Sequence, residues 1–147
     1  MLSAKGPLFQ SGFRLFTKKN NSEIEVTRKI KIMIVDDNVA NLKLAGDLLE
    51  IEGVDVCRCV DAEDAMEALK LFHPALILMD IALPGMDGLQ LTRKLKSEEN
   101  TKDIVIVALT ASAMKGDRER ILLTGCDGYM AKPINTRTFM EEVLQYL

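Results

Sequence analysis

The stretch IMIVDD, residues 32–37, places four consecutive apolar side chains before two carboxylates. Two further runs have the same form: residues 76–79 (LILM) end at Asp80, and residues 104–109 (IVIVAL) end at Thr110. Strands that are apolar on both faces are typical of a parallel sheet buried between helices, whereas half-exposed antiparallel strands alternate apolar and polar residues. The three runs therefore predict a buried parallel sheet with polar side chains where its strands end.

Segments with helical periodicity separate these strands. Apolar residues recur at helical spacing up to Gly53, and a second such segment follows Asp61, a residue suited to cap a helix, and ends before Pro74. Alternation of five strands with five helices predicts an α/β fold, a doubly wound five-stranded parallel sheet with helices on both faces. The expected strands are 32–35, 54–60, 76–79, 104–109 and 128–131, and the expected helices lie within 42–50, 62–72, 89–95, 112–124 and 139–144.

The first 29 residues do not follow this alternation. Residues 1–31 contain seven basic and two acidic side chains, whereas the rest of the chain contains twelve basic and twenty acidic ones. Phe9, Phe13 and Phe16 have the spacing of a basic amphipathic helix that could dock on the domain. Too few apolar groups are present, however, to offset the entropy of ordering this leader. We therefore expect a basic, flexible N-terminal extension, residues 1–29, before one domain, residues 30–147.

Composition excludes several classes of protein. A chain of 147 residues suffices for one ordinary domain, and no apolar run approaches the roughly 18 residues of a membrane-spanning helix, so we expect no membrane insertion. A net charge of −3 gives no reason to expect nucleic acid as a partner. Cys57, Cys59 and Cys126 are an odd number in a chain without an export signal. We expect reduced, structural thiols and a cytoplasmic location.

The polar residues that follow the strands are Asp36 and Asp37, Asp80, Thr110 and Lys132. Because the carboxyl ends of parallel strands meet at one edge of the sheet, where ligands bind, we expect these side chains to converge. Three neighbouring carboxylates repel one another unless a cation joins them, and Mg²⁺ prefers carboxylates, waters and phosphate oxygens. A carboxylate beside Mg²⁺ is a plausible nucleophile toward phosphorus, and a hydroxyl and an ammonium can stabilise the transferred group.

Each of these residues also has a simpler interpretation. Asp36, Asp37 or Asn38 could merely cap the next helix, Asp80 and Thr110 could be loop residues, and Lys132 could be a solvated charge. The simpler interpretation must explain four strand ends independently. We therefore favour a shared phosphoryl site.

Four separated motifs resemble the response-regulator receiver domain of two-component signalling, which is CheY-like in fold. The resemblance implies a sheet with strand order 2-1-3-4-5, and in detail it is greatest to stand-alone regulators of the DivK type and to receivers appended to hybrid kinases. The motifs are VDDN at residues 35–38, LMD at 78–80 with LPGMDG at 83–88, LTA at 109–111 and YMAKP at 129–133.

The resemblance implies roles for these residues. Asp80 would accept a phosphoryl group from a phosphohistidine of a histidine kinase or a histidine phosphotransfer protein. Asp37, Asp80 and the backbone carbonyl of Ala82 would bind Mg²⁺ directly, and Asp36 would act mainly through water. In the family, the peptide bond after Lys132 is commonly cis.

The resemblance also implies a switch, and we expect the readout surface on the fourth helix, fifth strand and fifth helix of the domain, because these elements flank Thr110 and Lys132. Thr110 and Lys132 would contact phosphoryl oxygens, while Thr110 and Tyr129 would change position together. Candidate contacts to a downstream protein effector are Met114, Lys115 and Arg118, with Tyr129 beside them. No DNA-binding output module follows the last helix, so we expect signalling by protein contact.

Two other functions stay open at this point. A haloacid-dehalogenase-type phosphatase uses similar residues, but it carries a second aspartate two positions after its nucleophile, where this chain has Ala82 after Asp80. The chain could also be a receiver fragment of a hybrid histidine kinase, although Met1 and the leader favour a complete protein. On the favoured interpretation it is not an enzyme in the usual sense and catalyses only its own aspartyl phosphorylation and dephosphorylation.

Overall fold

A computed structural model of the chain describes residues 13–19, 22–112 and 114–147, with side chains from residue 29 onward. Five strands form one sheet in the order β4-β3-β5-β6-β7, and every neighbouring pair is parallel. This confirms the predicted order 2-1-3-4-5. The strands are β3 (Lys31–Val35), β4 (Asp55–Cys59), β5 (Leu76–Asp80), β6 (Val105–Thr110) and β7 (Gly128–Ala131).

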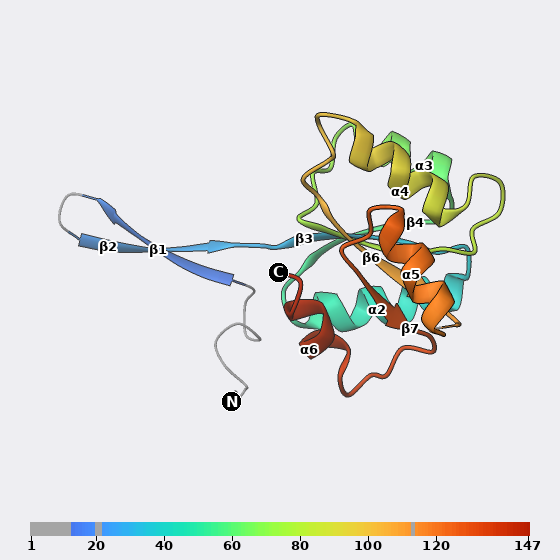
Figure 1. Cartoon of the computed structure of the whole chain (residues 1–147). Coiled ribbons are helices and arrows are strands. Elements are labelled where there is room, and N and C mark those ends of the chain that lie inside the picture. Colours follow the sequence, from blue (N-terminus) through green and yellow to red (C-terminus); the bar gives the residue numbers. More distant parts are fainter. Residues whose placement is uncertain (1–12, 20–21, 113) are drawn as a thin grey trace.

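Helices cover both faces of this sheet, as Figure 1 shows. One face packs against α2 (Val39–Ile51) and α6 (Phe139–Leu144), whose buried side chains include Leu49 and Phe139. The other face packs against α3 (Ala62–Ala68), α4 (Gly88–Ser97) and α5 (Lys115–Leu123). The central strand β5 is buried along its whole length because both of its faces are covered.

Side-chain caps fix where three of the helices begin. Asn38 accepts a hydrogen bond from the Asn41 backbone N–H at 3.1 Å before α2, and Asp61 accepts one from the Asp64 N–H at 2.8 Å before α3, as predicted. Asp87 and Gln90 form a reciprocal capping box at the start of α4. Asn38 is therefore the residue that caps α2, so the carboxylates of Asp36 and Asp37 are not needed as helix caps.

Element boundaries differ from the predicted ones by a few residues. Helix α5 begins at Lys115 instead of near residue 112, and α3 ends at Ala68, with turns continuing to residue 71. Among the described residues, no helix combines the length and apolar character needed to cross a membrane.

Residues 13–28 contain two strands that the sequence analysis did not predict. β1 (Phe13–Lys19) and β2 (Ser22–Arg28) pair antiparallel as a separate two-stranded sheet, with Leu15 opposite Val26 (Figure 1). The alternation of glutamate with Ile24 and Val26 is a strand signal that competes with the helical spacing of the phenylalanines. Flexibility of the extension stays a prediction, and Phe9 lies outside the described residues.

The three cysteines are free thiols in the core of the domain. The sulfurs of Cys57 and Cys59 lie 3.9 Å apart on one face of β4, and burial strongly raises the pKa of the Cys59 thiol. Burial also raises the pKa of the Cys126 thiol. Thiols with raised pKa values are poor nucleophiles and metal ligands, which agrees with the predicted structural role.

Candidate functional site

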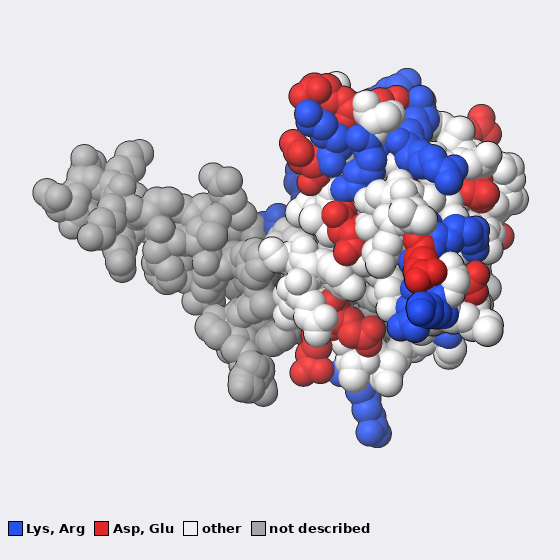
Figure 2. All heavy atoms as spheres, in the orientation of Figure 1, with Lys and Arg blue, Asp and Glu red and all other residues white. Residues whose placement is uncertain are grey.

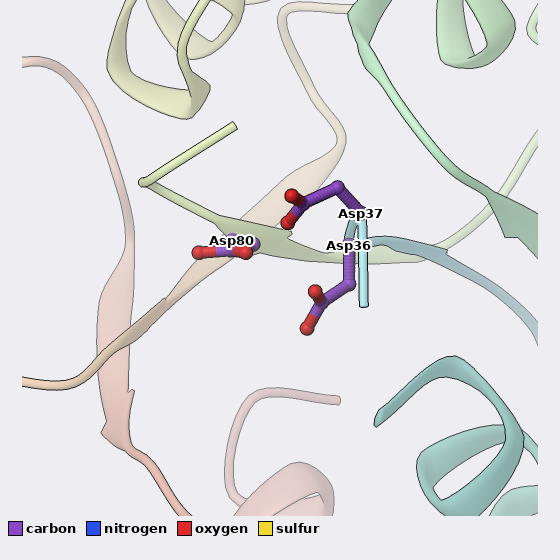
Figure 3. Close-up of side chains that lie close together, drawn as sticks. All are labelled: Asp36, Asp37 and Asp80. Atoms are coloured by element: carbon purple, nitrogen blue, oxygen red, sulfur yellow. The ribbon is translucent and has the colours of Figure 1, made fainter. Parts of the chain in front are cut away.

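Three carboxylates meet at the edge of the sheet where β3 and β5 end. Asp36 and Asp37 directly follow β3, and Asp80 is the last residue of β5. One oxygen of each carboxylate lies within 4.8 Å of an oxygen of the other two (Figure 3). Asp36 and Asp80 are buried, whereas Asp37 is exposed. The cluster is therefore open to solvent on the side of Asp37.

Lys132 brings a positive charge to these carboxylates from the end of β7. Its Nζ lies 3.1 Å from Oδ2 of Asp80 and 3.4 Å from Oδ2 of Asp36. The backbone N–H of Lys132 donates a hydrogen bond to the carbonyl of Thr110 at 2.8 Å, which ties the ends of β6 and β7 together. The bond between Lys132 and Pro133 is cis, as the resemblance implied.

Asp36 is held in a fixed orientation by two donors. The Asn38 backbone N–H donates to its Oδ1 at 2.9 Å, and the Asn41 side-chain amide donates to its Oδ2 at 3.3 Å. Burial raises the pKa of Asp36, and the neighbouring charge of Asp80 raises it further, while the Asn38 hydrogen bond and Lys132 oppose both effects. Sequence reasoning missed Asn41, which stands one helical turn after the acid pair.

Asp80 is fixed by the loop that follows it. The backbone N–H of Ala82 donates to Oδ1 of Asp80 at 3.0 Å, which leaves Oδ2 to face Lys132. Gly88, at the start of α4, packs directly on this segment, and a Cβ there would collide with the carbonyl oxygen of Asp80. The lack of a side chain at Gly88, the last residue of the LPGMDG motif, is what allows α4 to approach Asp80.

The remaining predicted residues lie around this cluster without joining it. The Thr110 hydroxyl, buried at the end of β6, forms its hydrogen bonds with the backbone of Ser112. Tyr129 is half-buried on β7, and its hydroxyl accepts a hydrogen bond from the Arg118 guanidinium at 3.4 Å. Met114 and Lys115 are exposed where α5 begins.

The donor set fits a hard divalent cation. Three carboxylates and one ammonium leave an excess of negative charge in a partly buried site, and all the acidic donors are oxygens. Mg²⁺ binds through one or two carboxylates and keeps several waters, which the exposed side at Asp37 allows. The residues present are therefore compatible with a magnesium site.

Solved structures share this architecture. The chemotaxis response regulator CheY4 of Vibrio cholerae superposes with a TM-score of 0.78, covering 82% of this chain and 100% of that one, at 21% identity, which supports the fold alone. The receiver domain of the sensor histidine kinase PA1611 from Pseudomonas aeruginosa matches with a TM-score of 0.73 at 32% identity over 81% of this chain and 98% of that one. That structure contains a magnesium ion coordinated in its active-site cleft.

Comparison of sequences gives the same result. The polar-differentiation response regulator DivK of Brucella ovis is 45% identical over 116 residues, which cover 79% of this chain and 94% of that protein. The DivK protein of Brucella anthropi is 43% identical over the same length. The family model for the response regulator receiver domain matches residues 32–144, which include the carboxyl ends of all five strands of the parallel sheet. The chain therefore belongs to the response-regulator receiver domain family of two-component signalling.

Proposed function

We propose that this protein is a phosphoacceptor regulator that receives a phosphoryl group on Asp80 and signals through phosphorylation-controlled protein contact. The donor would be a phosphohistidine on a histidine kinase or a histidine phosphotransfer protein. The observation that carries this proposal is the position of the Asp80 carboxylate, which the Ala82 N–H holds on one side and the Lys132 ammonium approaches to 3.1 Å on the other.

The reaction needs little from the protein besides positioning. A carboxylate oxygen of Asp80 forms a bond to phosphorus while the phosphorus–nitrogen bond of the phosphohistidine breaks, and the departing imidazole takes a proton from solvent. Carboxylates are ionised at neutral pH, so no general base is required. Hydrolysis reverses the modification when water attacks phosphorus, which restores the carboxylate and releases inorganic phosphate. Lys132 would offset the negative charge on the phosphoryl oxygens.

Asp37, Asp80 and the backbone carbonyl of Ala82 would hold Mg²⁺, with Asp36 acting mainly through water. Bound there, the ion would neutralise charge on the phosphoryl oxygens that Lys132 does not reach. The protein residues orient the site, because Asn38 and Asn41 fix the Asp36 carboxylate. The acidic cluster and the magnesium in a 32% identical neighbour support this assignment.

The output surface would lie where α5 begins, beside β7. Met114 is 73% exposed there, next to Lys115 and Arg118, and Arg118 contacts Tyr129. Basic and acidic side chains are interspersed on the face that Figure 2 shows. A rearrangement of Thr110 and Tyr129 would alter this surface, so a downstream protein effector could distinguish the two states.

Radiolabelling with acetyl phosphate or a phosphorylated kinase tests the proposal. The wild-type chain should take up label in the presence of Mg²⁺ and should take up none when EDTA is added before the donor. Asp80→Asn should take up none, whereas Asp103→Asn, an exposed aspartate in a loop, should label like the wild type. Persistent labelling of Asp80→Asn would reject Asp80 as the acceptor, and repeated turnover of a small phosphomonoester would favour a phosphatase instead.

A further inference from the structure

The Lys132 ammonium and the Thr110 hydroxyl are both proposed to contact the phosphoryl group, but they differ in their present hydrogen-bond partners. Lys132 already lies against Asp80, at 3.1 Å. Thr110 does not, because its hydroxyl is used twice by its own loop: it donates to the carbonyl of Ser112 at 2.7 Å and accepts from the Ser112 N–H at 3.1 Å. The loop must release Thr110 before this hydroxyl can reach a group on Asp80.

A side-chain contact holds the loop in this arrangement. The hydroxyl of Ser112 donates a hydrogen bond to the Asp117 carboxylate, in the first turn of α5. The N-cap residue of that helix, Met114, has no side-chain cap hydrogen bond. The Ser112–Asp117 contact therefore joins the loop to the first turn of the helix.

Helix α5 itself is weakly anchored to the rest of the domain. Ile121 is the one buried residue that it contributes among the described positions, and its first turn is largely exposed. A helix with so small a buried face has little free energy opposing a shift of its first turn. The Ser112–Asp117 contact therefore adds to the Arg118–Tyr129 hydrogen bond in fixing this end of α5.

We infer that Ser112 and Asp117 are positioning residues that restrain Thr110 in the unphosphorylated arrangement. The effect of this restraint on phosphoryl binding rests on the proposed function, whereas the restraint itself is a property of the unphosphorylated protein. Breaking the contact releases the loop, which raises the population in which the Thr110 hydroxyl faces Asp80. A phosphoryl analogue that binds this population then binds more tightly, in proportion to the population gained.

A titration with beryllofluoride and Mg²⁺, followed by NMR on the full chain, measures this population. Ser112→Ala should bind the analogue about tenfold more tightly than the wild type, since hydrogen bonds to charged groups have roughly this net worth. Asp117→Asn, which keeps a weaker neutral acceptor, should show a smaller gain of about threefold. Ser97→Ala and Glu119→Gln, changed in α4 and on the exposed side of α5, should match the wild type.

Thr110→Val distinguishes a restraint on Thr110 from a general structural effect. In the Thr110→Val background, which lacks the restrained hydroxyl, Ser112→Ala should leave the affinity for beryllofluoride unchanged. An equal gain in both backgrounds, or a loss of affinity in Ser112→Ala, would overturn the inference.

Hydrogen exchange separates failure of this inference from failure of the proposed function. If the wild type binds no beryllofluoride, the proposed function fails, and the restraint is judged in the resting protein. The backbone amide of residue 112, which donates to Thr110, should then exchange about tenfold faster in Ser112→Ala than in the wild type, and unchanged exchange would reject the restraint.

Discussion

The ammonium of Lys132 lies between Asp80 and Asp36, 3.1 Å from one carboxylate and 3.4 Å from the other. Its two partners come from different strands, so this one side chain joins the ends of β3, β5 and β7. The position explains how two buried carboxylates are tolerated side by side, because an uncompensated buried charge is costly.

Replacing Lys132 by methionine should slow phosphoryl uptake on Asp80 by about a hundredfold, the usual loss when one fixed charge-stabilising donor is removed. The rate of labelling by acetyl phosphate at saturating Mg²⁺ measures the effect. Lys102→Met is the matched control, because Lys102 pairs with the exposed Glu99 away from the site. Equal rates in the two variants would show that Lys132 takes no part in the reaction.

Gly88→Ala should lower the free energy of unfolding by about 2 to 3 kcal/mol, because the new methyl group would collide with the Asp80 carbonyl and force α4 away. Gly116→Ala in α5 is the matched substitution, since a Cβ there meets nothing within 4 Å. It should raise stability by about 0.5 kcal/mol through helix propensity. Urea unfolding measures both, and a gain in both variants would contradict the close approach of α4.

Mg²⁺ should stabilise the folded protein through the acidic cluster. At ten times its dissociation constant, an ion that binds only the folded state raises the free energy of unfolding by about 1.4 kcal/mol. Asp37→Asn should lose most of this gain, whereas Asp103→Asn should keep it. Urea unfolding with Mg²⁺ or EDTA tests the expectation, and a full gain in Asp37→Asn would place the ion elsewhere.

Glu52, at the end of α2 and away from the acidic cluster, should make the free energy of unfolding depend on pH. Burial raises the pKa of Glu52, and its Oε1 is a buried oxygen without a hydrogen-bond partner among the described residues. Between its ordinary pKa and the raised one, the folded state holds more protons than the unfolded state, so stability falls as pH rises through this window. The negative charge also lies at the unfavourable end of a helix.

Glu52→Gln should therefore be more stable than the wild type at pH 7, by roughly 1 kcal/mol for a partly buried charge, and equally stable near pH 3. Unfolding free energies across this range measure the difference. Glu119→Gln, an exposed glutamate of α5, should show little change at any pH. A constant difference between Glu52→Gln and the wild type would exclude titration of Glu52 as its cause.

Much of the fold and of the site could be predicted because both depend on local patterns. Unbroken apolar runs such as residues 76–79, separated by segments of helical spacing, indicate buried parallel strands. The convergence of Asp37, Asp80 and Lys132 follows from the parallel topology, because each residue stands at the end of a strand.

Other features depend on contacts between distant or weakly patterned residues. The close approach of Gly88 to Asp80 is set by the path of a turn, and the contact of Ser112 with Asp117 by the conformation of a loop. The strands at 13–19 and 22–28 carry an alternation too short to outweigh the competing helical spacing of the phenylalanines.

Residues 29 and 30 connect β2 to β3, the first strand of the parallel sheet. Lys31 is the first residue of the chain that takes part in the four parallel strand pairings, and the carbonyl of Ile30 accepts a hydrogen bond from the Asp55 N–H. A protein trimmed to start at residue 29 keeps all of these bonds. We therefore expect an altered phenotype after removal of the leader to report on the leader itself instead of on a damaged receiver.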